Sequence, residues 1–149
     1  MRRSTVLSIE SVFILLVILA AILDILWRKI PNPVNFSLLL SGFFCALLGW
    51  GQISVLESIS SVCVSLGALL IPFALNIYRG GDVKLCLGMS AWLGIEGGLW
   101  VIALGVVGGG ILGGIMLLFR RKGSKKSIPM AVCFSAAGLW IQRFGPPSW

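Results

Sequence analysis

The sequence predicts an all-α membrane protein, a bundle of six transmembrane helices. Of its 149 residues, 58% are hydrophobic and only 11% are charged, whereas soluble domains carry roughly a quarter charged residues. The mean hydropathy is +1.03, and long apolar segments alternate with short stretches that hold prolines, glycines and charges. We therefore expect residues 1–149 to form a single integral-membrane domain, with no room for a soluble one.

The first two helices are predicted on either side of a proline-containing loop. A basic start followed by an apolar run resembles a signal peptide, but the run over 11–27 continues into Asp24 and the basic pair at 28–29. We predict a retained first helix over 11–27. Pro31 and Pro33 favour a turn and are not expected inside a helix, so the second helix is predicted over 34–50.

The next three helices are predicted from the length of the apolar segments. The third covers 58–78, with Pro72 as a kink that a membrane bundle tolerates. Residues 85–119 contain one charge, Glu96, and exceed the ~20 residues of a single crossing. Glycines at 94–98 indicate the break, which gives a fourth helix over 83–95 and a fifth over 99–119.

A glycine stripe in the fifth predicted helix indicates close helix packing. Gly105, Gly109 and Gly113 recur every four residues, with Gly110 and Gly114 offset by one. Such spacing lets helices approach closely. A basic loop follows, and the sixth helix is predicted over 128–141.

The distribution of basic residues predicts the orientation. Nine lie in the odd-numbered loops and three on the other side, so the odd loops are expected in the cytoplasm and both termini outside. The two arginines near the N-terminus argue the other way. The nine are Arg28, Lys29, Arg79, Lys84, Arg120, Arg121, Lys122, Lys125 and Lys126, and the three are Arg2, Arg3 and Arg143.

Composition also excludes some functions. The chain has 12 basic and 5 acidic residues, but the basic residues are divided among loops, which suits anionic lipid rather than nucleic acid. It has no histidine, and its four cysteines form no CxxC pair. A metal site is therefore not expected, and we predict no cofactor.

The two aspartates of the chain, Asp24 and Asp82, each lie where an apolar segment meets a polar loop. Asp24 has a structural alternative as an i,i+4 ion pair with Arg28, and Asp82 has one as a helix N-cap. The predicted topology puts both at the same membrane face. Two carboxylates packed together tend to share one proton, which supplies both a general base and a general acid.

These residues resemble those of the type IV prepilin peptidases, intramembrane aspartic proteases with a GxGD motif. The matching elements are Asp24 with Ile30-Pro31-Asn32, and Gly81-Asp82-Val83-Lys84-Leu85. The resemblance implies cleavage of the leader peptide of pilin-like precursors at the cytoplasmic face of a prokaryotic membrane. It also implies that Asp24 and Asp82 are catalytic. The residues that support them would be Gly80, Gly81, Lys84, Pro31 and Asn32.

Two departures from the family pattern shape the alternatives. Arg79 stands where the motif has its first glycine, which favours a catalytically silent relative that binds pilins as an assembly factor. The cysteine-rich insertion that accompanies N-methylation is absent, so the chain is similar to the short peptidases of Flp pilus systems or to preflagellin peptidases. A proton- or ion-conducting bundle is a third hypothesis. The substrate sequence and the oligomeric state are left open.

Overall fold

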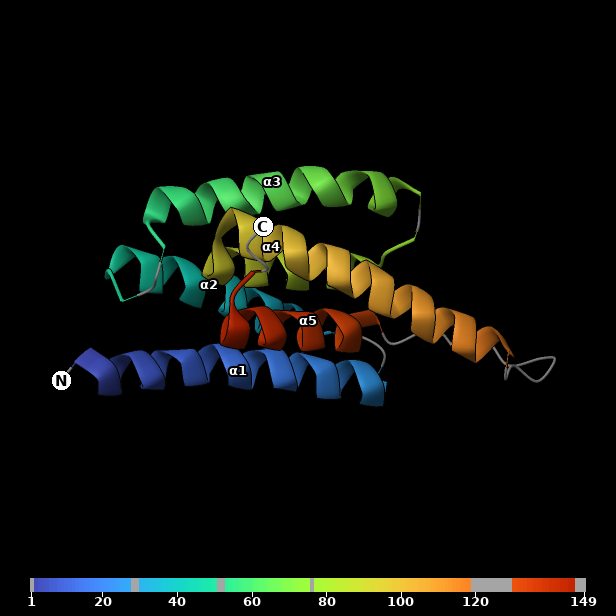
Figure 1. The fold of residues 1–149 in the computed structure, drawn as a ribbon, viewed down its shortest axis with the longest axis horizontal. Coiled ribbons are helices and arrows are strands. Elements are labelled where there is room, and N and C mark those ends of the chain that lie inside the picture. The colour runs from blue at the N-terminus through green and yellow to red at the C-terminus, as the bar shows by residue number, and fades with distance from the viewer. Residues whose placement is uncertain (1, 28–29, 51–52, 76, 119–129, 147–149) are drawn as a thin grey trace.

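The protein is all-α, as predicted. The computed structural model describes residues 2–27, 30–50, 53–75, 77–118 and 130–146. Within these ranges the chain forms five helices (Figure 1): α1 (Arg2–Trp27), α2 (Asn32–Leu47), α3 (Val55–Ala74), α4 (Gly80–Leu118) and α5 (Met130–Phe144).

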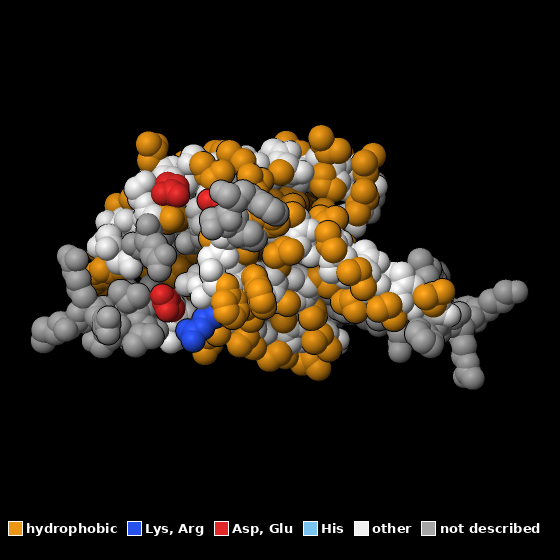
Figure 2. Space-filling view, viewed as in Figure 1, with side chains coloured by type: hydrophobic (Ala, Val, Ile, Leu, Met, Phe, Trp, Pro, Cys, Tyr) orange, Lys and Arg blue, Asp and Glu red, His pale blue; other side chains and the backbone are white. Residues whose placement is uncertain are grey.

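The helices lie side by side along the long axis of the molecule, with α4 in contact with α2, α3 and α5 (Figure 1). Among the described residues, three segments are long and apolar enough to cross a membrane: Glu10–Trp27, Val55–Ala74 and Gly80–Ile115. Figure 2 shows a surface dominated by hydrophobic side chains, with the visible charged ones gathered toward the left of the view. This exterior is that of a membrane protein.

The interruption predicted at 94–98 is confined to one residue. Gly94 has φ 75° and ψ −176°, and the backbone on both sides of it is helical, so two helical segments join at a kink within α4. The predicted count of six separate helices therefore appears as five in the described chain. A single residue suffices because glycine adopts positive φ without a Cβ clash. A Cβ at position 94 would also lie 2.9 Å from Oε1 of Glu57.

Helices α1 to α4 all begin earlier than the sequence predicted, and capping explains the starts of α2 and α3. Pro31 is the N-cap of α2, and Pro33 lies in its first turn, where a missing N–H costs nothing. The expectation that neither proline enters a helix was wrong for Pro33. In α3, Ser54 is the N-cap and its side chain accepts a hydrogen bond from the Glu57 backbone N–H at 3.2 Å. Glu57 therefore belongs to the first turn of α3 rather than to the preceding loop.

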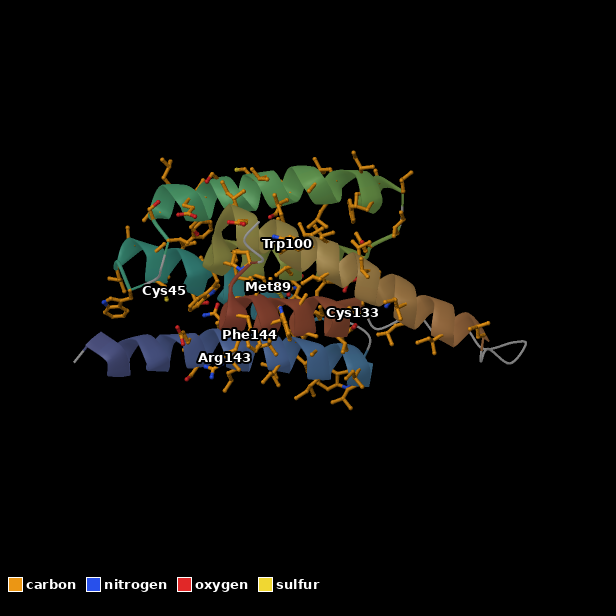
Figure 3. The ribbon with its side chains drawn as sticks, in the orientation of Figure 1. Cys45, Met89, Trp100, Cys133, Arg143 and Phe144 are labelled. Atoms are coloured by element: carbon orange, nitrogen blue, oxygen red, sulfur yellow. The ribbon has the colours of Figure 1, made fainter. Side chains whose placement is uncertain are left out.

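The glycine stripe of α4 packs closely against another helix, as predicted, and the structure identifies that helix as α5. The ring of Phe134 occupies the space that a Cβ at Gly105 would need, and Met130 does the same at Gly109. The same two helices also meet with the roles exchanged, so that α5 contributes the glycine. Met89 of α4 lies in the interior of the bundle (Figure 3), against Gly138 of α5. The offset glycines differ: a Cβ at Gly110 would meet nothing within 4 Å.

A row of buried serines joins α3 to the first half of α4. Ser58 Oγ donates to the Ala91 carbonyl at 2.8 Å, and Ser61 Oγ donates to the Ser90 carbonyl at 2.6 Å. The hydroxyl groups of Ser65 and Ser90 are hydrogen-bonded to each other at 2.7 Å. Hydrogen bonds between helices stabilise a membrane bundle by roughly 0.6–2 kcal/mol each, so this row holds α3 and α4 in a fixed register.

Candidate active site

Asp24 lies in the last turn of α1 and is 5% exposed. Its Oδ2 accepts a hydrogen bond of 3.2 Å from the backbone N–H of Ala131, in the first turn of α5. The N-terminus of a helix carries partial positive charge and unpaired N–H donors, so α5 favours a negative charge on Asp24. Arg28, the ion-pair partner that the sequence suggested, lies outside the described residues.

Asp82 lies in the first turn of α4 and is likewise 5% exposed. The backbone N–H groups of Asp82 and Val83 donate to the Arg79 carbonyl, so Arg79 precedes the helix as its capping residue. In return, the Arg79 backbone N–H donates to Oδ2 of Asp82 at 3.4 Å. The sequence suggested Asp82 as the N-cap itself, but α4 begins at Gly80 and places Asp82 three residues inside the cap.

The first turns of α5 connect the surroundings of the two aspartates. Ala131 bonds Asp24, and Phe134 packs against Tyr78, four residues before Asp82. The negative charge of Asp24 also acts on Asp82. Each is held by one backbone N–H at the start of a different helix, α5 for Asp24 and α4 for Asp82. Neighbouring buried carboxylates favour a state in which one is charged and the other protonated.

The start of α2 packs against the first turn of α4, next to Asp82. A Cβ at Gly81 would lie 3.8 Å from Cβ of Ile30, which is buried. Asn35 Nδ2 donates to the Gly81 carbonyl at 3.4 Å, and Lys84 Nζ donates to Asn32 Oδ1 at 3.0 Å. These contacts join the Ile30-Pro31-Asn32 motif, which follows α1, to the motif of residues 81–85 at the start of α4.

The remaining acidic residues do not join this site. Glu57 lies beside the Gly94 kink, where its Oε1 would be 2.9 Å from a Cβ at position 94. Both Glu57 and Glu96 are exposed. Among the described residues, no three His, Cys, Asp or Glu side chains gather in a way that would hold a metal ion. Among the described residues, the buried acidic side chains are thus those of Asp24 and Asp82.

A comparison with protein families matches residues 11–114 to the model of the type IV leader peptidase family. The match spans both aspartates and most of the chain. The protein belongs to the type IV leader peptidase family. It is therefore an aspartic prepilin peptidase. The comparisons with curated proteins and with solved structures gave no match.

Arg79, which departs from the family motif, is exposed at the cap of α4. Its charge acts favourably on the Asp82 carboxylate, in addition to the hydrogen bond from its backbone N–H. Because any residue except proline supplies that N–H, the peptidase keeps the main-chain contact of this turn without the motif glycine.

Tyr78 is a residue of this peptidase site that the sequence did not single out. It is buried, and its ring meets that of Phe134 of α5 edge-on, with 5.6 Å between the ring centroids. Burial raises the pKa of the Tyr78 phenol above its ordinary value, and negative charge on Cys86 or Asp82 would raise it further. The contact ties the loop before Asp82 to the same helix that holds Asp24.

Asn35 also escaped the sequence analysis, although a signal was present. It follows Asn32 by three residues, which places both amides on one face of α2, and both contact the first turns of α4. The family match ends at residue 114, so α5, which contributes Ala131 and Phe134, lies beyond it.

Proposed function

We propose that Asp24 and Asp82 are the catalytic pair with which this peptidase cleaves the leader of pilin-like precursors. The observation that carries the proposal is the mutual placement of the two carboxylates. They come from α1 and α4, are almost fully buried and act electrostatically on each other. Each is held by a backbone N–H.

The chemistry follows from a shared proton. The charged carboxylate takes a proton from a water molecule, whose oxygen attacks the scissile carbonyl carbon. The protonated carboxyl group meanwhile donates a hydrogen bond to the carbonyl oxygen as negative charge develops there. Collapse of the tetrahedral intermediate breaks the C–N bond, and the carboxyl group that was protonated at the start gives its proton to the leaving amine. The mechanism requires no metal or cofactor.

The site residues outside the pair have supporting roles in this proposal. Gly80 and Gly81 begin α4 directly before Asp82, and Gly81 lies against Ile30. Lys84 and Asn32 bridge α4 to α2. Pro31 is the N-cap of α2, directly before Asn32.

We place this reaction at the cytoplasmic face of a prokaryotic membrane. The two halves of α4 on either side of Gly94 would each cross, giving six crossings within a single membrane domain of residues 1–149. The kink at Gly94 supports this arrangement, and the nine-to-three division of basic residues supports cytoplasmic odd loops. The substrates would be Flp-type pilins, preflagellins or similar precursors.

The test is cleavage of a purified pilin-like precursor by the wild-type protein and by Asp24→Asn, Asp82→Asn and the double variant. Asparagine keeps the size of the side chain but removes its acid–base function. We expect each single change to abolish cleavage and the double change to be no worse, because the two residues act as a unit. Membrane insertion and accumulation should be unchanged, since helix packing maintains the bundle.

Cleavage by either well-inserted single variant would refute the assignment of the pair. An inactive wild-type protein that still binds the precursor would instead favour the role of a pilin-binding assembly factor.

A further inference from the structure

Asn35 carries a buried hydrogen-bond acceptor beside the catalytic turn. The residue is 3% exposed, and its Nδ2 donates to the carbonyl of Gly81, which precedes Asp82. Within the described part of the chain, its Oδ1 is buried and receives no hydrogen bond. The donor side of the amide is thus anchored to the Gly81 carbonyl of α4, and the acceptor side is buried beside that first turn, which also carries Asp82.

A buried acceptor without a partner is costly in a membrane protein, because lipid offers no donor to replace water. An apolar side chain of similar size, such as leucine, would avoid that cost. The neighbouring buried positions on the same face of α2 are apolar or small, at Leu38, Gly42 and Ala46. An asparagine at position 35 therefore suits a site in which a donor arrives from outside the chain.

The reaction supplies such a donor. A peptide bond within a helix is shielded, so the segment around the scissile bond must be extended when water attacks its carbonyl. Extension leaves main-chain N–H groups of the substrate without partners, and inside a buried site each needs an acceptor from the protein. Acceptors that pair with a main chain bind a peptide independently of its side chains.

We infer that Asn35 Oδ1 accepts a hydrogen bond from a main-chain N–H of the leader peptide next to the scissile bond. The inference rests on the proposed function of the Asp24–Asp82 pair. Asn35 would then be a substrate-positioning residue, aligning the scissile carbonyl through the Gly81 turn to which its own amide is bound.

The experiment separates binding from chemistry. A synthetic peptide covering the leader junction of a pilin-like precursor is titrated against the full-length Asp82→Asn protein, with and without Asn35→Leu. We expect Asn35→Leu to weaken binding about tenfold, as for the loss of one hydrogen bond, while the temperature of unfolding stays equal or rises. In the active protein, Asn35→Leu should raise KM by a similar factor.

Asn35→Ala, which inserts no bulk, carries the same test if the leucine variant does not accumulate. Ser41→Ala is the matched control, because Ser41 is a partly buried polar residue of α2 whose hydroxyl group bonds the Leu38 carbonyl and the Trp92 indole N–H but not the Gly81 turn; the peptide affinity of this variant should equal that of the parent. Unchanged affinity in both Asn35 variants would overturn the inference, whether or not kcat fell. A fall in kcat alone would assign Oδ1 to the attacking water. Neither result would affect the catalytic pair, which the Asp→Asn variants test separately.

Discussion

The backbone N–H of Arg79 donates to Oδ2 of Asp82, and the Arg79 carbonyl accepts the N–H of Asp82 in return. This reciprocal pair of main-chain hydrogen bonds closes the first turn of α4. It resembles a capping box, in which the third residue of a helix reaches back to the cap. The residue that departs from the family motif thus supports the aspartate through its backbone as well as through its charge.

For Arg79→Gly we therefore expect cleavage to be retained. Glycine preserves the backbone N–H and is accepted at helix N-caps. The variant loses only the exposed side chain of Arg79, so its kcat should stay near that of the wild-type protein. Cleavage rates of a pilin-like precursor by both purified forms check this. A large loss of kcat in the variant would contradict the prediction.

Ala131→Pro tests the support that α5 gives to Asp24. Proline removes the N–H that bonds Asp24 and adds a ring at a buried position, and the first turn of a helix tolerates proline, as α2 does at Pro33. Hydrogen bonds to charged groups contribute roughly 1.5–3 kcal/mol, so kcat should fall about ten- to a hundredfold. Ala131→Gly keeps the N–H and should remain near wild-type activity. Equal losses in both variants would point to packing of Ala131 instead.

Gly105→Ala and Gly110→Ala form a matched pair on the second half of α4. The added methyl group at Gly105 overlaps the ring of Phe134, whereas at Gly110 it meets nothing. Overpacking costs about 1–3 kcal/mol, while alanine in a helix is about 0.5–1 kcal/mol more stable than glycine. Thermal unfolding in detergent should show destabilisation by the first change only. Similar melting temperatures would argue against close packing of α5 at this stripe.

The orientation is testable by cysteine labelling in a variant without the four natural cysteines. New cysteines replace Lys29, Lys125 and Ser148, and intact cells are treated with a membrane-impermeant thiol reagent. We expect reaction at position 148 only, with positions 29 and 125 reacting after permeabilisation. Labelling of position 125 from outside would reverse the orientation inferred from the basic loops.

Hydropathy predicted where the helices lie, because burial in lipid requires continuous apolar segments. It did not predict where they begin, since that depends on single capping residues such as Ser54 and on the tolerance of a first turn for Pro33. The break in α4 was predicted from length, but its confinement to Gly94 depends on one backbone conformation. The serine row had a readable signal, because Ser58, Ser61 and Ser65 share one helix face.

The two aspartates were identifiable because acidic residues at membrane depth are costly and rare. The residues that contact the aspartates or pack beside them could not be identified from the sequence. Ala131 contacts Asp24 through its backbone, which no side-chain pattern records. Tyr78 meets Phe134 across a long sequence separation, and hydropathy does not distinguish that contact from ordinary packing. Long-range contacts of this kind follow from the assembled bundle rather than from any local stretch of sequence.

The hydrogen bond between Asp24 and Ala131 spans 107 positions of the chain, and this separation has a consequence for biosynthesis. A ribosome makes the N-terminal segments first, so α1 and α4 emerge with both aspartates before α5 exists. A chain that stops before Met130 would contain the pair without the N–H that holds Asp24 or the ring that packs on Tyr78. We therefore expect proteolytic activity to begin only once the last helix has entered the bundle.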